Sequence, residues 1–279
     1  MLDKTIIQQI EDLVYSKPRT IQEIAKQINK NWRTADRYVE DIGKEFGTLA
    51  TRTFREGTRG ALKIAYWASI EKAQSNIFQK KLENEIELFK RKEDFSSFDI
   101  YQHIPDKNKS MTLSKAEDES KTDLNELKNF FLTTKNQLLI FSGNLSFVNL
   151  KNENCEIFKA IEELVKNKIS IKIVCRVDYI SYKTIEKILS LNYKYGGEYI
   201  QIHHSEQPVR GMIRDNKEIR LKEIKEPTGK IDELNKKVYI YYKMNDSEWA
   251  SWLSKVFWKN FSNSIDAKKR MEDLEKYLF

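Results

Sequence analysis

The N-terminal quarter of the chain shows an ordered series of local signals that restricts its fold. Apolar residues at helical spacing over residues 3–15 predict a first helix, which ends where Pro18 blocks its continuation. Thr20 and Glu23 have the spacing of a capping box, in which each residue satisfies a backbone N–H of the other. A second helix is therefore expected to begin at Ile21.

A third helix and a pair of strands complete this series. Asn29 favours a turn after the second helix, because Asn adopts left-handed backbone geometry more easily than most residues. Asn31 can cap a third helix over residues 32–46. Two extended segments follow at 49–55 and 61–67, and the five residues between them include two glycines. That pattern predicts a β-hairpin with a flexible tip.

The segment EIAKQINKNWRTADRYVEDI resembles helix-turn-helix sequences. Two short helices cross closely only where a small residue lies at the contact, and Ala25 supplies one. The packing face of the following helix would consist of its apolar residues, Ala35, Tyr38, Val39 and Ile42. Lys30 departs from the family, which usually has an apolar residue there. The resemblance implies that residues 1–67 form a winged helix-turn-helix DNA-binding domain.

The N-terminal end of the third helix would then enter the major groove, where arginine can contact guanine through two hydrogen bonds. The predicted DNA-reading residues are Asn31, Trp32, Arg33, Thr34 and Arg37. The hairpin, as the wing, would add contacts to phosphate or the minor groove from Arg52, Arg55 and Arg59. Two alternatives stay open: Trp32 can instead cover the edge of the core, and a winged helix can bind protein instead of DNA.

Charge supports an anionic partner only weakly. The 279 residues carry a net charge of +7, yet compositional bias toward lysine can produce such a value by itself. Residues 30–63 hold eight basic and five acidic side chains, which modestly favours double-stranded DNA as the partner.

The next two segments differ in character. Residues 68–91 predict a connecting helix whose apolar stripe either pairs with a second copy of the chain or packs onto the first helix. Residues 92–119 are polar, and they predict a linker with little regular structure.

Residues 120–279 alternate between helices and strands, and they end in strands at 209–215, 217–224 and 236–244 followed by two helices. This order predicts a mixed sheet in an α/β domain, so the whole chain combines α+β and α/β parts.

The order of elements after residue 120 resembles one half of a phospholipase D-like fold. Active members carry His-x-Lys-x-x-x-x-Asp, and the matching segment here has Pro208, Arg210 and Asp215 at those three positions. Proline has no nucleophilic atom, so covalent phosphoryl transfer cannot proceed through that position. We therefore expect a catalytically degenerate domain and no enzymatic activity. An anionic ligand or effector would contact Arg210, Arg214 and Asp215.

The chain as a whole resembles archaeal TrmB-type regulators, which combine a winged helix, a dimerising helix and an inactive phospholipase D-like domain. Its N-terminal sequence motif differs from the one usual in that family. The resemblance implies a homodimeric transcriptional regulator whose C-terminal part serves dimerisation and response to a small-molecule or anionic effector. Two alternatives are a phospholipase D-type nuclease with a DNA-targeting domain and a protein-binding winged-helix adaptor.

Other classes of protein are not indicated. Cys155 and Cys175 occur in unrelated contexts, and the histidines do not join them in a metal-ligand spacing, so we predict no disulfide, metal or other cofactor. No apolar run approaches the roughly 18 residues that a membrane helix needs. The N-terminus lacks the features of a signal peptide, and we expect a cytoplasmic protein.

Overall fold

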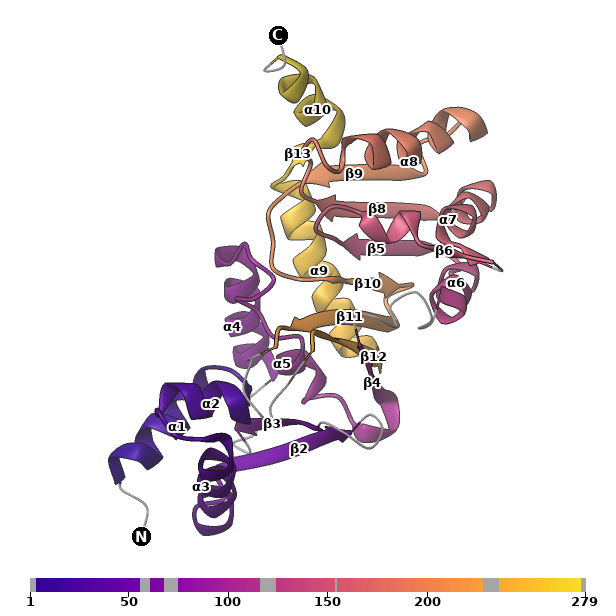
Figure 1. Ribbon diagram of the computed structural model, residues 1–279. Coiled ribbons are helices and arrows are strands. Elements are labelled where there is room, and N and C mark those ends of the chain that lie inside the picture. Colours follow the sequence, from indigo (N-terminus) through magenta and orange to yellow (C-terminus); the bar gives the residue numbers. More distant parts are fainter. Residues whose placement is uncertain are drawn as a thin grey trace. The chain divides into compact units, whose positions relative to one another are not determined.

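The computed structural model describes residues 4–55, 61–67, 75–115, 124–153, 155–227 and 236–276. The chain forms two compact units (Figure 1). Unit 1 comprises residues 1–80 and 224–239, and unit 2 comprises residues 81–223 and 240–279.

Unit 1 contains the predicted series of helices and strands. Its elements are α1 (Lys4–Ser16), β1 (Arg19–Thr20), α2 (Ile21–Gln27), α3 (Trp32–Glu45), β2 (Leu49–Arg55) and β3 (Ala61–Trp67). The three strands form an antiparallel sheet in the order β1-β3-β2, so the hairpin strand β3 is central. This is the arrangement of a winged helix-turn-helix.

A small apolar core holds unit 1 together. The buried faces of α1, α2 and α3 meet there, and its members include Ile10, Ile24, Ala25, Ala35, Val39 and Ile42. Gly43 lets the end of α3 approach the start of β2, because a Cβ atom at this position would lie 2.7 Å from the carbonyl oxygen of Leu49. The end of α3 therefore packs directly against the start of β2.

Most of unit 2 is built on an eight-stranded sheet with the order β13-β9-β8-β5-β10-β11-β12-β4. These strands are β4 (Lys109–Lys115), β5 (Gln137–Phe141), β8 (Ser170–Cys175), β9 (Ile200–His204), β10 (Gly211–Arg214), β11 (Glu218–Lys225), β12 (Val238–Asn245) and β13 (Ile265–Asp266). The neighbours β5, β8 and β9 run parallel, whereas β10 is antiparallel to both β5 and β11. The sheet is therefore mixed, as the sequence predicts.

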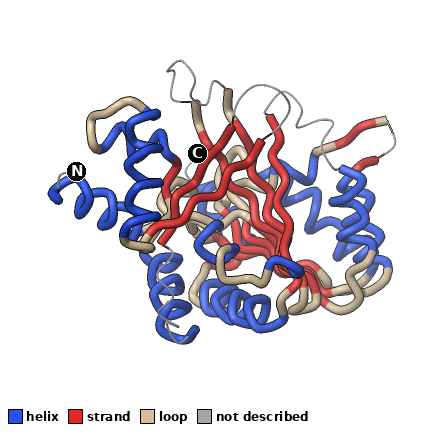
Figure 2. Tube along the Cα trace, turned by 90° about the horizontal axis from the view of Figure 1, so that it is seen from below, coloured by secondary structure: helices blue, strands red, loops and turns tan. Residues whose placement is uncertain are grey.

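Helices cover both faces of this sheet, and Figure 2 shows the strands as a twisted layer between them. One face packs on α6 (Leu124–Leu132), α7 (Ile157–Lys166), α8 (Tyr182–Tyr195) and α10 (Ala267–Lys276). On the other face α9 (Ser247–Ser262) crosses β8, β5 and β10 (Figure 1). Phe257 of α9 meets Phe141 of β5 edge to face, with 5.1 Å between ring centroids.

One segment differs from the sequence-based expectation. The predicted linker 92–119 is not irregular over its described residues 92–115, which contribute α5 (Phe98–Tyr101), a 3-10 turn (Asp106–Asn108) and β4, a strand at the edge of the large sheet. Residues 116–119 lie outside the described part. The reason is that Phe95, Phe98 and Tyr101 are buried and hold this segment in the core. The polar residues around them leave no apolar periodicity that would predict an ordered segment. The connecting helix, α4, is described over Ser75–Leu88, and residues 68–74 lie outside the described part.

Short elements complete the described chain. A 3-10 turn at Ser146–Asn149 precedes a small two-stranded sheet of β6 (Lys151–Asn152) and β7 (Cys155–Glu156). Among the described residues, none of the helices combines the length and the apolar character needed to cross a membrane.

Candidate functional site

The turn between α2 and α3 sets the direction of α3. Asn29 adopts a φ of 52°, and the N–H groups of Asn29 and Lys30 donate to the carbonyls of Lys26 (3.3 Å) and Ala25 (2.9 Å). This pair of bonds is a Schellman motif, which satisfies the last carbonyls of a helix and reverses the chain. Ala25 and Ala35 are fully buried where the two helices cross.

Asn31 caps α3. Its side-chain oxygen accepts a hydrogen bond of 2.8 Å from the N–H of Thr34, the bond that an N-cap residue typically makes. Asn31 is exposed and Thr34 is half-buried. The amide oxygen of Asn31, predicted to face DNA, is therefore engaged in holding the start of the helix.

The next residues of α3 divide between packing and exposure. Trp32 is half-buried and packs against the core of unit 1, the second of the two roles considered for it. Arg33 and Arg37 are exposed, and their guanidinium groups lie over the rings of Trp32 and Tyr38 at 5.9 and 5.6 Å from the centroids. Both arginines lie opposite the buried stripe of the helix.

The wing is described only in part. Arg52 on β2 is exposed, and its guanidinium group lies 5.8 Å from the ring centroid of Phe54. Arg55 ends β2, but its side chain lies outside the described residues, as does the whole of Arg59. The structure thus places Arg33, Arg37 and Arg52 in unit 1 as exposed cations.

Acidic residues also lie on α3, and a lysine of the wing contacts them. Lys63 on β3 places its Nζ 2.6 Å from a carboxylate oxygen of Asp36 and 2.6 Å from one of Glu40. Burial by itself would lower the pKa of Lys63, but the hydrogen bonds to both carboxylates outweigh it and raise that pKa. The same lysine lowers the pKa of Glu40. Lys63 and Glu40 are therefore both charged near neutral pH.

Sequence reasoning counted Lys63 among the basic residues of this region and missed its partners. The signal available was the i, i+4 spacing of Asp36 and Glu40, which places both carboxylates on one side of α3. Which side of α3 faces β3 depends on the packing of the helix on the sheet, and no local pattern encodes that.

Of the three residues predicted to contact an anion, Arg210 lies beside the carboxyl end of β5. Its guanidinium group packs against Gly143, since a Cβ there would lie 3.2 Å from Nε, and Nη1 donates to the carbonyls of Gln207 and Val209. Burial and the nearby Arg176 lower the pKa of Arg210. Ligands of open α/β sheets commonly bind at this end of the strands.

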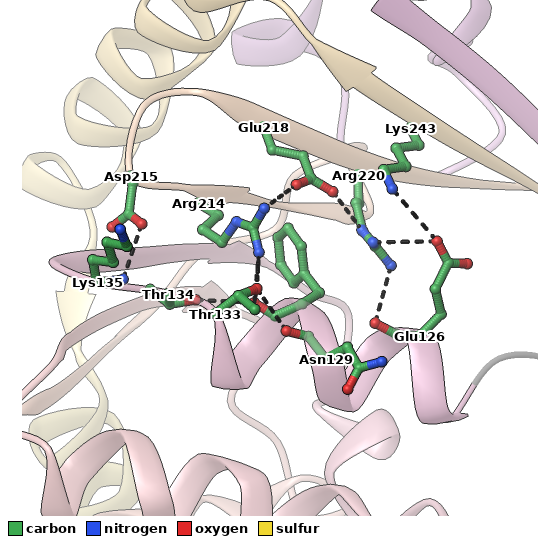
Figure 3. Close-up of polar contacts among 11 residues, drawn as sticks. Glu126, Asn129, Thr133, Thr134, Lys135, Arg214, Asp215, Glu218, Arg220 and Lys243 are labelled. Atoms are coloured by element: carbon green, nitrogen blue, oxygen red, sulfur yellow. Dashed lines mark hydrogen bonds and ion pairs between the residues drawn. The ribbon is translucent and has the colours of Figure 1, made fainter.

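Arg214 and Asp215 lie at the other end of β10, where both are committed to internal contacts (Figure 3). Arg214 pairs with buried Glu218 and donates to Thr133. Asp215 accepts three backbone hydrogen bonds, from Lys135 (2.9 Å), Asn136 (2.8 Å) and Gln137 (3.0 Å).

The predicted cluster of Arg210, Arg214 and Asp215 is therefore not formed. Arg210 directly precedes strand β10, whereas Arg214 is its last residue and Asp215 follows it. The four residues of β10 separate the two ends by roughly 13 Å at about 3.3 Å per residue. The middle of the motif from Pro208 to Asp215 does lie on a strand, as the sequence predicts. Because Arg214 and Asp215 are engaged in internal contacts, only Arg210 remains a candidate for contact with an anion.

No cluster of three or more His, Cys, Asp or Glu side chains able to hold a metal ion occurs among the described residues. Both cysteines are buried and reduced, and burial raises the pKa of Cys175 to about 12.

No protein-family model matches the sequence, and no curated protein matches it. Solved structures that resemble it include Nuc, a phospholipase D family member from Salmonella typhimurium (12% identity, TM-score 0.40), which aligns over 57% of this chain and 97% of its own. TrmBL2, an archaeal chromatin protein that binds DNA, aligns over 95% of this chain and 94% of its own (12%, 0.38).

A third similar structure is phosphatidylserine synthase from Haemophilus influenzae (10% identity, TM-score 0.39), which aligns over 76% of this chain and 56% of its own. At such identities these likenesses concern the fold alone. The order of the elements and of the strands in this chain confirms the predicted fold class, a winged helix-turn-helix, a connecting helix and a mixed α/β domain.

The expectation that the chain is not an enzyme is contradicted by these comparisons. The similar structures include a phospholipase D family member and a phosphatidylserine synthase, which are enzymes by name. Pro208, which is buried shortly before β10, excludes a nucleophilic side chain at that position. It does not exclude enzymatic activity that uses other residues.

Proposed function

We propose that this chain is a sequence-specific DNA-binding protein that regulates transcription as a homodimer. In this proposal α3 lies in the major groove of duplex DNA, and the β2–β3 hairpin contacts the adjacent backbone. The larger unit would serve dimerisation and respond to an effector, with Arg210 as the contact for an anionic group.

The observation that carries this proposal is the exposure of Arg33 and Arg37 on the face of α3 opposite its core. The two residues are one helical turn apart, so their side chains leave the same face and can reach neighbouring base pairs. Their long side chains end in guanidinium groups that match the acceptor pair of guanine in the major groove. Asn31 and the Schellman turn hold the start of this helix in place.

The test begins with the full-length protein and a randomised duplex library. We expect selection to return a palindromic site, because two recognition helices related by two-fold symmetry read inverted half-sites. Arg33→Ala and Arg37→Ala should each weaken binding to the selected duplex by about 1–3 kcal/mol, measured by fluorescence anisotropy. Random duplex of the same length should lose much less affinity.

Arg91→Ala is the matched control, since Arg91 is an exposed arginine of unit 2 and its loss changes the net charge equally. Absence of duplex binding at low salt would defeat the proposal. Equal losses on selected and random DNA would show that the two arginines contact phosphates and read no sequence.

A further inference from the structure

The face that α3 would present to DNA includes acidic as well as basic side chains. Arg33, Arg37 and Lys44 are exposed on the side opposite the core. Glu40 is also exposed, and it lies only about 60° around the helix from Arg37 at 3.6 residues per turn. A carboxylate so close to the arginines would repel phosphate, and it could also pair with Arg37 at spacing i, i+3.

Lys63 compensates for both carboxylates from the neighbouring strand. Its Nζ lies 2.6 Å from Asp36 and 2.6 Å from Glu40, and the lysine side chain is only 18% exposed. Because Lys63 is on β3, opposite Thr53 of β2, the two ion pairs also join the wing to α3. Arg37 has no carboxylate partner within the described part of the chain; its guanidinium group lies over Tyr38.

We infer that Lys63 is a positioning residue of the DNA-binding surface: by pairing with Asp36 and Glu40 it removes their repulsion toward phosphate and leaves Arg37 of α3 available to DNA. The inference rests on the proposed function and adds a role for a residue that need not touch DNA itself. It also explains how a recognition helix tolerates two acidic residues one turn apart beside Arg33 and Arg37.

The experiment is a double-mutant cycle on the full-length protein with a duplex that the wild type binds. Lys63→Met keeps the apolar stem and removes the charge, and we expect it to weaken binding roughly tenfold, because it leaves two unpaired carboxylates beside the duplex. In the background D36N/E40Q, the same Lys63→Met change should alter Kd by less than about threefold, since no carboxylate is left to compensate.

Lys194→Met is the matched control: Lys194 forms a similar pair with Glu162, 2.6 Å long, in unit 2. It removes one positive charge without touching α3, so its effect on Kd should be small. Thermal unfolding of every variant separates a loss of folded protein from a loss of affinity, and a variant that unfolds is replaced by Lys63→Gln.

The outcomes separate the two claims. If the wild type binds DNA and Lys63→Met binds equally well, the inference is wrong and the proposed function stands. If Lys63→Met weakens binding as much in the D36N/E40Q background as in the wild type, Lys63 contacts DNA directly and the inference is again wrong. If the wild type binds no duplex, the proposed function fails first and the inference fails with it.

Discussion

Asp215 holds the start of β5 through three backbone hydrogen bonds, donated by residues Lys135, Asn136 and Gln137. Its own backbone has a φ of 51°, which Asp and Asn tolerate better than other side chains. Burial raises the pKa of Asp215, but the three N–H groups and Arg214 outweigh it and bring that pKa below the ordinary value of 3.8. The carboxylate is thus part of the fold.

Asp215→Asn tests this role at the scale of one residue. The amide keeps the backbone conformation but has one acceptor oxygen in place of two, and we expect the free energy of unfolding at pH 7 to fall by about 1–2 kcal/mol. Because the folded-state pKa is lowered, the contribution is present above the unfolded pKa and disappears as the pH falls through the folded value. The difference between wild type and variant should therefore shrink below about pH 4.

Urea unfolding monitored by circular dichroism at pH 7 and at successively lower pH measures this difference. Asp273→Asn is the control, because Asp273 forms an exposed ion pair with Lys276 and should change stability by less than about 0.5 kcal/mol. A stability difference between wild type and Asp215→Asn that stays constant down to pH 2 would contradict the assignment.

At the scale of the element, α3 depends on the residue that precedes it. Asn31 directly precedes Trp32 and closes the first turn by accepting a hydrogen bond from the N–H of Thr34. A cap of this kind contributes about 1 kcal/mol, and serine supplies it nearly as well as asparagine. A residue that reads DNA through its side-chain amide has no such substitute.

Asn31→Ser and Asn31→Ala distinguish capping from DNA contact. If capping is the role, Asn31→Ser should keep both stability and duplex affinity, whereas Asn31→Ala should lose about 1 kcal/mol of stability and part of its affinity. Thermal unfolding and fluorescence anisotropy of the same samples check this. Should Asn31→Ser fold as the wild type does but bind as weakly as Asn31→Ala, the amide contacts DNA.

At the scale of the whole molecule, the net charge of +7 is spread over the chain, so the position of the cations matters more than their sum. Binding of duplex DNA by arginines of α3 and the wing would release counterions. The logarithm of the association constant should then fall linearly with the logarithm of the salt concentration, with a slope near −0.9 for each phosphate neutralised.

We expect Arg52→Ala to reduce the magnitude of that slope by about one for each protomer bound, because Arg52 lies on the wing strand and would contact phosphate. Anisotropy titrations between low and physiological salt provide the measurement, with Arg91→Ala as control. Binding that does not respond to salt would point away from nucleic acid and toward the protein-binding adaptor.

Local signals determined much of unit 1. The capping box at Thr20 and Glu23, the left-handed Asn29 and the cap at Asn31 each act within four residues, so the sequence places them without knowledge of the fold. The alternation of helices and strands after residue 120 likewise follows from periodicity, and the mixed sheet follows from their order.

Tertiary structure alone decided which side chains meet. Lys63 pairs with Asp36 and Glu40 because the packing of unit 1 brings its side chain to α3. Asp215 binds the start of β5 because β10 runs antiparallel to that strand. The polar segment around Phe98 and Tyr101 is ordered by distant partners, since Tyr101 packs on Tyr242 with 5.1 Å between ring centroids. Such contacts join residues far apart in the chain, and their energies depend on geometry that no short stretch of sequence specifies.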